Sequence, residues 1–369
     1  MIKPIAFYLP QFYPFPENDK WWGKGFTEWT NVKKSRPLFP GHYQPTVPLN
    51  ENYYSLNDIE TMYWQVDLAK KYNIYGFCFY HYWFGEDRQL MEKPVDAFLA
   101  HRDLDLPFCL SWANHNWSRT WVGGDKDILM DMRYGDQGEW EKHFQYLIPF
   151  FKDERYIKVD NKPVFLIYLP ADIPNLKEMC DYFRERAIQN GFNGLLIVSQ
   201  NSSFPNDEVY HLLDYFVEYE PNYATSEFWK SPVQTSLLSP RFSANMISHA
   251  VKATMRRKLG LPQKALPLSY DAIWDYIIKH KPVDSKRIAG AFVRCDVSPR
   301  RQERAIIYVG DSPEKFSAYM KRMTTKIQKE YSTDYLFLSA WNEWGEGMYL
   351  EPDEKHGYGY LEGVRDAVK

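Results

Sequence analysis

The sequence lacks most of the short motifs that identify a particular chemistry. It contains no Gly-x-Gly-x-x-Gly fingerprint and no phosphate-binding loop, the usual signals for dinucleotides and nucleoside triphosphates. It also has no His-Glu-x-x-His sequence and no Gly-x-Ser-x-Gly elbow, which would indicate a zinc protease or an α/β-hydrolase. The histidines show no metal-ligand spacing. The expectation is therefore an activity that needs no metal and no cofactor.

Cysteine is scarce, and targeting signals are absent from the sequence. The four cysteines form no Cys-x-x-Cys pair, and three lie in apolar strand-like runs, so they are predicted to be buried thiols. The first residues, MIKPIAFYLPQF, lack the basic segment and apolar core of a signal peptide. No apolar run approaches membrane-spanning length. The expectation is a cytoplasmic protein without a transmembrane segment.

Excess charge of one sign is missing overall but present locally. The net charge of −3 argues against a generally basic surface, so no nucleic-acid partner is expected. The stretch 230–270 differs, because it has no acidic residue. A solvated helix face is the ordinary interpretation. The functional alternatives are a contact with an anionic glycan, with a lipid-linked pyrophosphate sugar or with a membrane surface. Its basic residues are Lys230, Arg241, Lys252, Arg256, Arg257, Lys258 and Lys264.

Strand-like apolar runs recur along the chain, each followed by a segment of helical or charged character. Eight such units are what a (β/α)₈ barrel requires, so the predicted fold is an α/β TIM barrel that forms one domain over 1–369. The region 221–267 has no single clear helix and is interpreted as a basic insertion after the sixth strand. The predicted strands are 3–9, 75–80, 108–112, 163–168, 195–199, 215–219, 287–293 and 335–341.

Aromatic and amide side chains follow three of the predicted strands. Aromatic residues make up 17% of the chain, and Trp and Tyr faces can stack on sugar rings, although an aromatic core would give the same composition. Amides match the hydroxyls of a sugar. Because these groups recur at strand ends, where TIM barrels keep their active sites, they are predicted to bind a glycan. The candidates are Gln11, Trp22, Glu28, Trp29, His81, Tyr82, Trp83, Trp112, Asn114, Asn116, Trp117 and Arg119. For His81 a structural role is the more usual alternative.

A pair of carboxylates follows the last predicted strand. The stretch 335–353 reads YLFLSAWNEWGEGMYLEPD, with Glu343 and Glu346 on a glycine-containing turn. Cleavage of an acetal needs one acid to protonate the departing oxygen and one base or nucleophile on the sugar side, which two such groups supply. A solvated acidic turn is the alternative. Glu343 and Glu346 are the predicted catalytic residues.

The same runs resemble the WbsX-like family over nearly the whole chain. The similar blocks include YLPQF from Tyr8, WWGKGFTEWTNV from Trp21, GFCFYHYWF from Gly76 and WNEW from Trp341. The Asn-Glu-Trp-x-Glu-Gly core also resembles glycoside hydrolase family 99, the endo-α-mannosidases and mannanases. The resemblance implies a hydrolase-type barrel with Tyr8, Asn342 and Trp344 among its sugar-site residues. Members of the WbsX-like family are, however, often described as glycosyltransferases of polysaccharide synthesis.

The resemblance also implies roles and one departure. In family 99 the first Glu acts as a base on the substrate's own 2-hydroxyl, which closes onto the anomeric carbon as an epoxide, and the second Glu protonates the leaving oxygen. By position these are Glu343 and Glu346. One of the pair is expected to hold its proton near neutral pH. The block VRCDVSPR from Val293 keeps Asp296, Pro299 and Arg300 but lacks an aromatic and an amide that the family pattern would have.

The sequence therefore predicts a retaining glycoside hydrolase acting on an oligosaccharide or polysaccharide. One alternative is a glycosyltransferase or transglycosylase of surface-polysaccharide assembly. Another is a glycan-binding barrel without catalysis.

Overall fold

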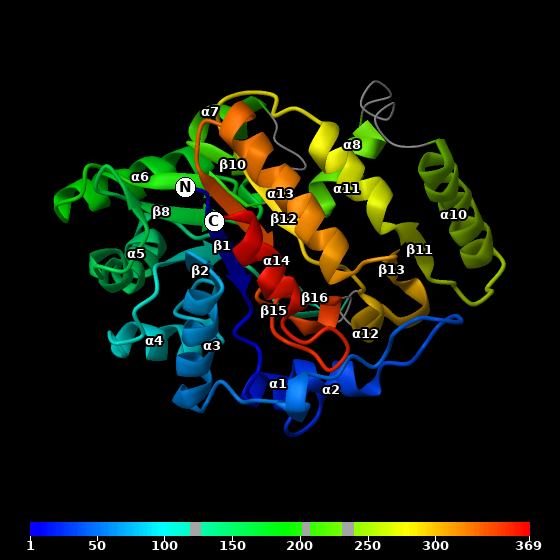
Figure 1. Cartoon of the computed structure of the whole chain (residues 1–369). Helices are drawn as coiled ribbons and strands as arrows, with labels where there is room; N and C mark the ends of the chain where they lie inside the picture. Colours follow the sequence, from blue (N-terminus) through cyan, green and yellow to red (C-terminus); the bar gives the residue numbers. More distant parts are fainter. Residues whose placement is uncertain (119–126, 201–206, 231–239) are drawn as a thin grey trace.

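The computed structural model describes residues 1–118, 127–200, 207–230 and 240–369. At its centre eight parallel strands close into a barrel surrounded by helices, which confirms the predicted fold (Figure 1). The strand order is β1-β14-β12-β10-β9-β8-β4-β2, and β2 pairs back with β1. The barrel strands are β1 (Lys3–Tyr8), β2 (Gly76–Trp83), β4 (Phe108–Trp112), β8 (Lys162–Ile167), β9 (Leu196–Ser199), β10 (Tyr215–Val217), β12 (Arg287–Phe292) and β14 (Tyr335–Ser339).

The barrel strands are apolar because both of their faces are covered. All eight residues of β2 are buried, as are all six of β12. One face looks into the barrel, where Phe7 packs between aromatic rings of other strands, 5.8 Å from Tyr80, 5.3 Å from Tyr219 and 5.4 Å from Phe337 between ring centroids. Side chains thus fill the barrel interior, as is usual for this fold.

The outer ring consists of helices that follow the barrel strands, as the predicted (β/α)₈ pattern requires. Several begin where a side chain caps the first turn: Asp136 accepts from Gly138 N at 3.0 Å, and Ser312 accepts from Lys315 N at 3.3 Å. The helices of the ring are α3 (Ile59–Lys71), α4 (Glu92–Ala100), α5 (Gln137–Lys152), α6 (Leu176–Gln189), α7 (Asp207–Leu212), α11 (Tyr270–Lys279), α13 (Pro313–Glu330) and α14 (Gly359–Ala367).

The region 221–267 is more helical than its sequence indicated. It contains α8 (Asn222–Lys230) and the long helix α10 (Pro240–Lys258), followed by β11 (Leu266–Ser269). Strand β11 lies outside the barrel and pairs in parallel with β13 (Ile306–Val309). Helix α10 lies at the outer edge of the molecule, away from the ring of helices (Figure 1). Most side chains of this helix are exposed to solvent, so it lacks the buried apolar face by which a helix is predicted from sequence.

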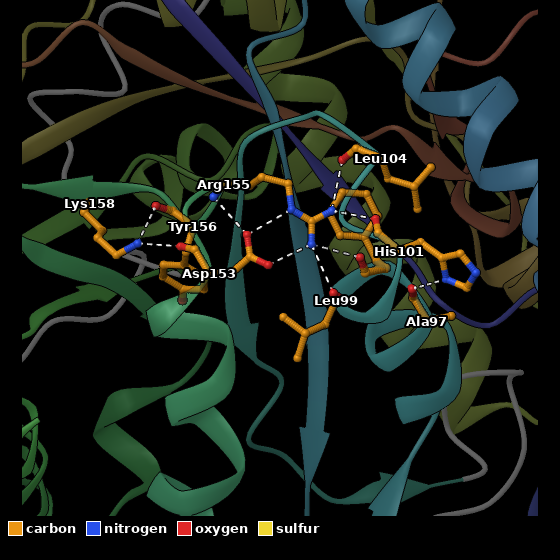
Figure 2. A network of polar contacts seen from close by, with 9 residues as sticks. Ala97, Leu99, His101, Leu104, Asp153, Arg155, Tyr156 and Lys158 are labelled. Carbon is orange, nitrogen blue, oxygen red and sulfur yellow. Dashed lines mark hydrogen bonds and ion pairs between the residues drawn. The ribbon is translucent and has the colours of Figure 1, made fainter.

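A buried arginine joins the end of α4 to the chain that leads into β8. Figure 2 shows the Arg155 guanidinium between Asp153 and the backbone that follows α4. The guanidinium donates hydrogen bonds to both carboxylate oxygens of Asp153 at 2.9 Å and to the carbonyl oxygens of His101 and Leu104 at 3.0 Å. It also donates to Phe98 O and Leu99 O. Carbonyls at a helix end have no partner within the helix, so one cation satisfies several of them.

The substitution Arg155→Met tests this contribution. It leaves Asp153 and several carbonyls without their partner in a buried site, so the free energy of unfolding should fall by about 3–5 kcal/mol. Urea denaturation monitored by Trp fluorescence measures the change.

Arg133→Met is the matched control. Arg133 makes ion pairs with Asp131 and Glu86 at the surface, and such pairs contribute about 0–1 kcal/mol. Equal losses in the two variants would mean that Arg155 is no more than a surface charge.

Candidate active site

A cavity of about 230 Å³ opens at the carboxyl ends of the barrel strands. Its wall is formed by side chains that follow most of these strands and by β13 and α8. Seven of the predicted site residues belong to this wall: Gln11, Trp22, Glu28, Tyr82, Trp117, Glu343 and Glu346. Other wall residues include Leu9, Phe26, Tyr80, His115, Tyr168, Tyr219, Asn222, Cys295, Val297, Arg300, Ile306, Tyr308 and Met348.

One guanidinium holds three carboxylates in this wall. Arg300 comes from α12 (Ser298–Arg301), just beyond β12. It donates to Glu343 Oε1 at 2.6 Å, to Glu346 Oε1 at 2.6 Å and to Glu28 Oε2 at 3.0 Å. Glu28 begins α2 (Glu28–Lys34), in the long loop after β1. The planar, forked geometry of Arg allows these bonds at the same time, which the point charge of Lys does not.

Glycine permits this close approach. The two catalytic candidates lie on either side of Gly345, in a short 3₁₀ turn at Trp344–Glu346. A Cβ atom on Gly345 would overlap the Glu28 carboxylate and lie 2.8 Å from Arg300 Nε. Gly347 has a φ of +63°, in the left-handed region that favours glycine. The Gly-containing turn is thus required by the ion cluster beneath it.

Burial and like charge set the protonation of the pair. The pKa of Glu343 is raised to about 8, chiefly by burial; Arg300 opposes the rise, and the neighbouring Glu346 and Glu28 add to it. The Glu343 side chain is 9% exposed, whereas that of Glu346 is 21% exposed and closer to solvent. The raised pKa favours the protonated form of Glu343 at neutral pH. This agrees with the expectation that one of the two carboxyl groups stays neutral.

A layer of polar and aromatic side chains supports the pair from behind. Asn342 clips the end of β1, because Leu9 N donates to its Oδ1 at 2.7 Å and its Nδ2 donates to Leu9 O at 3.0 Å. Trp344 stacks on Tyr349 and donates its indole N–H to Glu351 at 2.7 Å. Burial raises the pKa of Glu351 to about 7.

Two further predicted residues belong to this supporting layer. Tyr8 reaches the same carboxylate through Gln65, which accepts from Tyr8 Oη at 2.6 Å and donates to Glu351 at 2.7 Å. Trp29 packs against Trp344 with ring centroids 5.3 Å apart. Tyr8, Trp29, Asn342 and Trp344 therefore lie behind the wall rather than in it.

Asp296 also acts from behind the wall. Its Oδ2 contacts His42 Nε2 at 2.8 Å and Gln44 Nε2 at 2.6 Å, and its backbone N–H donates to Glu346 O at 2.7 Å. Burial alone would raise its pKa, but the hydrogen bonds from His42, Ser298 and Gln44 outweigh burial and lower it. Asp296 thus stays ionised and fixes the turn that carries Glu346.

The remaining predicted residues have other surroundings. His81 contacts His143 at 2.8 Å between their Nε2 atoms, and burial lowers the pKa of His81 to about 3. Trp83 and Trp112 pack on the same His143 ring, with centroids 5.0 Å and 4.8 Å away. These three residues therefore form an aromatic cluster against α5, which is the structural alternative for His81.

The predicted amides serve the backbone. Asn114 bonds both Leu169 N and Leu169 O, at 2.7 and 2.8 Å. Asn116 accepts from Met132 N at 2.7 Å. Each joins two loops. Arg119 lies outside the described residues.

Sequence reasoning missed several wall residues. Tyr80, Tyr168 and Tyr219 were inside or next to predicted strands, and only a three-dimensional arrangement brings them together; the hydroxyls of Tyr80 and Tyr219 lie 3.2 Å apart. Arg300 belongs to the block that resembles the WbsX-like pattern, but it is not among the predicted site residues. Its position soon after the end of the strand predicted at 287–293, where TIM barrels keep their site residues, was the available signal.

The raised pKa of Glu343 predicts how a glutamine at this position changes stability. Between pH 4.5, the ordinary pKa, and about 8, the unfolded chain releases this proton while the folded chain keeps it, so wild-type stability falls as pH rises. Glu343→Gln lacks this cost. Its Tm should exceed that of the wild type by more at pH 8 than at pH 5, corresponding to on the order of a few kcal/mol.

Differential scanning calorimetry at several pH values measures this effect, with the exposed Glu330→Gln on α13 as the control. A Tm difference for Glu343→Gln that stays constant with pH would contradict the raised pKa.

The described residues include no group of three or more His, Cys, Asp and Glu side chains arranged to hold a metal ion. Likewise, no helix within the described ranges is long and apolar enough to span a bilayer.

Comparison with known proteins adds relatives for the whole chain. Residues 4–364 match the family described as Glycosyltransferase WbsX. The protein WxcX of Xanthomonas campestris pv. campestris is 32% identical over 367 residues, which are 99% of this chain and 49% of WxcX. The chain thus spans about half the length of the curated relatives it matches.

Solved structures share the fold. The GH99 endo-alpha-mannosidase from Bacteroides thetaiotaomicron has a TM-score of 0.52 and 14% identity, over 99% of this chain and 95% of that one. A glycoside hydrolase-like protein has a TM-score of 0.57 and 12% identity, over 100% and 94% of the two chains. At these identities the likeness shows a common barrel. The sequence match over almost the full length shows more: the chain belongs to the WbsX glycosyltransferase family.

Proposed function

We propose that the chain is a carbohydrate-active enzyme that hydrolyses glycosidic bonds with retention of configuration. The observation that carries this proposal is the placement of Glu343 and Glu346 in one cavity at the carboxyl ends of the strands, on the same guanidinium. Two carboxyl groups that share one proton are the minimum that glycoside cleavage requires. The barrel shared with the GH99 endo-alpha-mannosidase and the glycoside hydrolase-like protein supports the same reaction class.

The proposed substrate is an oligosaccharide or polysaccharide bound along the aromatic wall. Trp22, Tyr82 and Trp117 line the cavity from three different elements, α1 (Pro16–Trp22), β2 and β5 (Trp117–Ser118), and offer ring faces to the apolar side of a sugar. Tyr82 and Trp117 are in contact, with centroids 5.4 Å apart, so they form one surface. Gln11 and Asn222 supply amide groups for hydroxyls in the same wall.

In the proposed mechanism the substrate provides its own nucleophile. Glu343 takes the proton of the 2-hydroxyl as that oxygen bonds to the anomeric carbon, while Glu346 gives its proton to the departing glycosidic oxygen. Water then opens the 1,2-anhydro sugar with the two roles reversed, so the product keeps the anomeric configuration of the substrate. Arg300 holds both carboxyl groups in fixed positions throughout.

Glu343 must be ionised to act as the base, but its raised pKa favours the protonated form at neutral pH. Its pKa of about 8 makes it a stronger base than an ordinary carboxylate once that proton has left. The proposal therefore requires that the shared proton reside on Glu346 in the complex with substrate. If Glu343 were instead the acid, its protonated state in the free enzyme would already be the active one.

Transfer to a second sugar is the alternative, and the description of the family supports it. A hydrolase with this pair needs neither a nucleotide sugar nor a metal. We therefore expect the purified chain to release reducing ends from members of a glycan panel, with turnover unchanged by EDTA. Activity that requires a nucleotide sugar, or that EDTA abolishes and manganese restores, would instead support the transferase.

Glutamine variants test the two carboxyl groups separately. Glu343→Gln and Glu346→Gln should each lower kcat by roughly 10²–10⁴-fold, the usual contribution of an acid or base. An activated aryl leaving group, which needs no protonation, should restore much of the rate to Glu346→Gln and little to Glu343→Gln.

Glu330→Gln, at the exposed end of α13, is the control and should keep wild-type kcat. Rescue of Glu343→Gln in place of Glu346→Gln would exchange the two roles. Wild-type turnover in both folded variants would refute the assignment of the pair.

A further inference from the structure

Helix α10 carries an apolar stripe that faces solvent. Ile247, Val251 and Met255 are 53%, 54% and 56% exposed, and Leu259, directly after the helix, is 68% exposed. These residues are four apart, so they follow one another along one side of the helix. Large apolar side chains of a soluble domain are normally scattered singly on its surface, so a continuous row indicates a contact.

The opposite side of α10 is already in use. Met246 is buried. His249 Nε2 lies 3.0 Å from Lys264 O, and Arg256 donates to Pro262 O at 2.8 Å. These contacts hold the segment that leads to β11 against the helix, so the apolar stripe is the side that points away from the molecule. The helix itself lies at the outer edge of the structure (Figure 1).

Basic side chains border the apolar stripe. Lys252 and Lys258 are exposed; at 100° per residue Lys252 falls on one side of the stripe and Lys258 continues the stripe at its end, whereas Arg257 lies on the side of Met246. No acidic residue occurs anywhere in 230–270, although the chain as a whole has a net charge of −3. The surface is therefore apolar along its middle and positive at its borders.

We propose that α10 binds the surface of an anionic lipid bilayer. An amphipathic helix of this kind lies in the plane of the interface, with its apolar row among the acyl chains and its basic residues at the headgroups. Lys and Arg suit the border because their long stems stay in the apolar layer while the charge reaches the headgroups. This inference goes beyond the proposed hydrolysis and does not depend on it.

Charge complementarity favours a membrane over a second copy of the chain. Two α10 helices that met through their apolar rows would bring basic borders of the same sign together. Anionic lipids attract those borders instead.

The position of α10 gives the contact a consequence for the cavity. Helix α10 leads into β11, which pairs with β13, and Ile306 and Tyr308 of β13 line the cavity. Binding through α10 would therefore hold this wall of the cavity close to the membrane. A glycan attached to a lipid or lying on the surface of the membrane would be within reach.

Vesicle sedimentation of the whole chain tests the proposal. The protein should sediment with vesicles of phosphatidylcholine and phosphatidylglycerol and stay in solution with phosphatidylcholine alone. Binding should weaken as salt rises, because the charges are screened. No sedimentation with the anionic vesicles at low salt would overturn the proposal.

Two variants distinguish the two parts of the surface. Val251→Ser with Met255→Ser should weaken vesicle binding by roughly tenfold or more, because two apolar side chains no longer enter the bilayer. Lys252→Gln with Lys258→Gln should weaken it by roughly fivefold for each charge removed. The matched control, Lys321→Gln with Lys329→Gln, removes two exposed charges on α13 and should bind as the wild type does.

Equal weakening in the control and the α10 variants would mean that net charge alone governs binding, and the proposal would fail. It would also fail if sedimentation velocity showed a dimer that the Val251→Ser, Met255→Ser variant dissolves. In that case a second copy covers the apolar row.

Discussion

The bonds of Arg300 to Glu28, Glu343 and Glu346 are the interaction on which the site depends. They join the loops after β1, β12 and β14, which are far apart in the sequence and adjacent in the barrel. The three carboxyl groups lie close together and would repel one another if all were ionised, and one cation offsets only part of that charge. Burial, with the negative charge of Glu346 and Glu28, raises the pKa of Glu343, whereas Arg300 lowers it, so the contact that assembles the pair also limits this rise.

The sequence predicted most of the fold and the centre of the site, because both depend on local patterns. Buried parallel strands are continuous apolar runs, and the turn at Gly345 lies within a few residues of the strand before it. Local patterns could not predict that the side-chain amides of Asn114 and Asn342 bind the backbone of other loops. Asn114 and Asn342 look like sugar ligands at strand ends, but the loops that they clip, at Leu169 and Leu9, come close only in the folded barrel.

Arg300 and helix α10 are two further features that local sequence patterns did not predict. A cation that serves three loops has no periodicity or spacing that relates it to Glu28. The apolar residues of α10 recur every four positions, but they face solvent, so their pattern does not mark a helix that packs on the core. Where sequence reasoning failed, the structure has either a long-range ion cluster or a surface that is not covered by the rest of the chain.

The block after β12 contributes part of the cavity wall, and its sequence differs from the WbsX-like pattern. The departure from the WbsX-like pattern falls at Cys295 and Val297, which line the wall next to Ile306 and Met348. A small apolar surface thus replaces an aromatic and an amide, while Arg300 at the end of the block is retained.

The most direct measurement of the shared proton is ¹³C NMR of the carboxyl groups in protein labelled at glutamate. One resonance of the wild type should titrate near pH 8, and it should be missing from the spectrum of Glu343→Gln. If the resonance that Glu343→Gln removes titrates below about pH 5.5 in the folded wild type, near the ordinary range of a carboxyl group, then Glu343 holds no proton at neutral pH and the acid and base roles of the pair lose their physical basis.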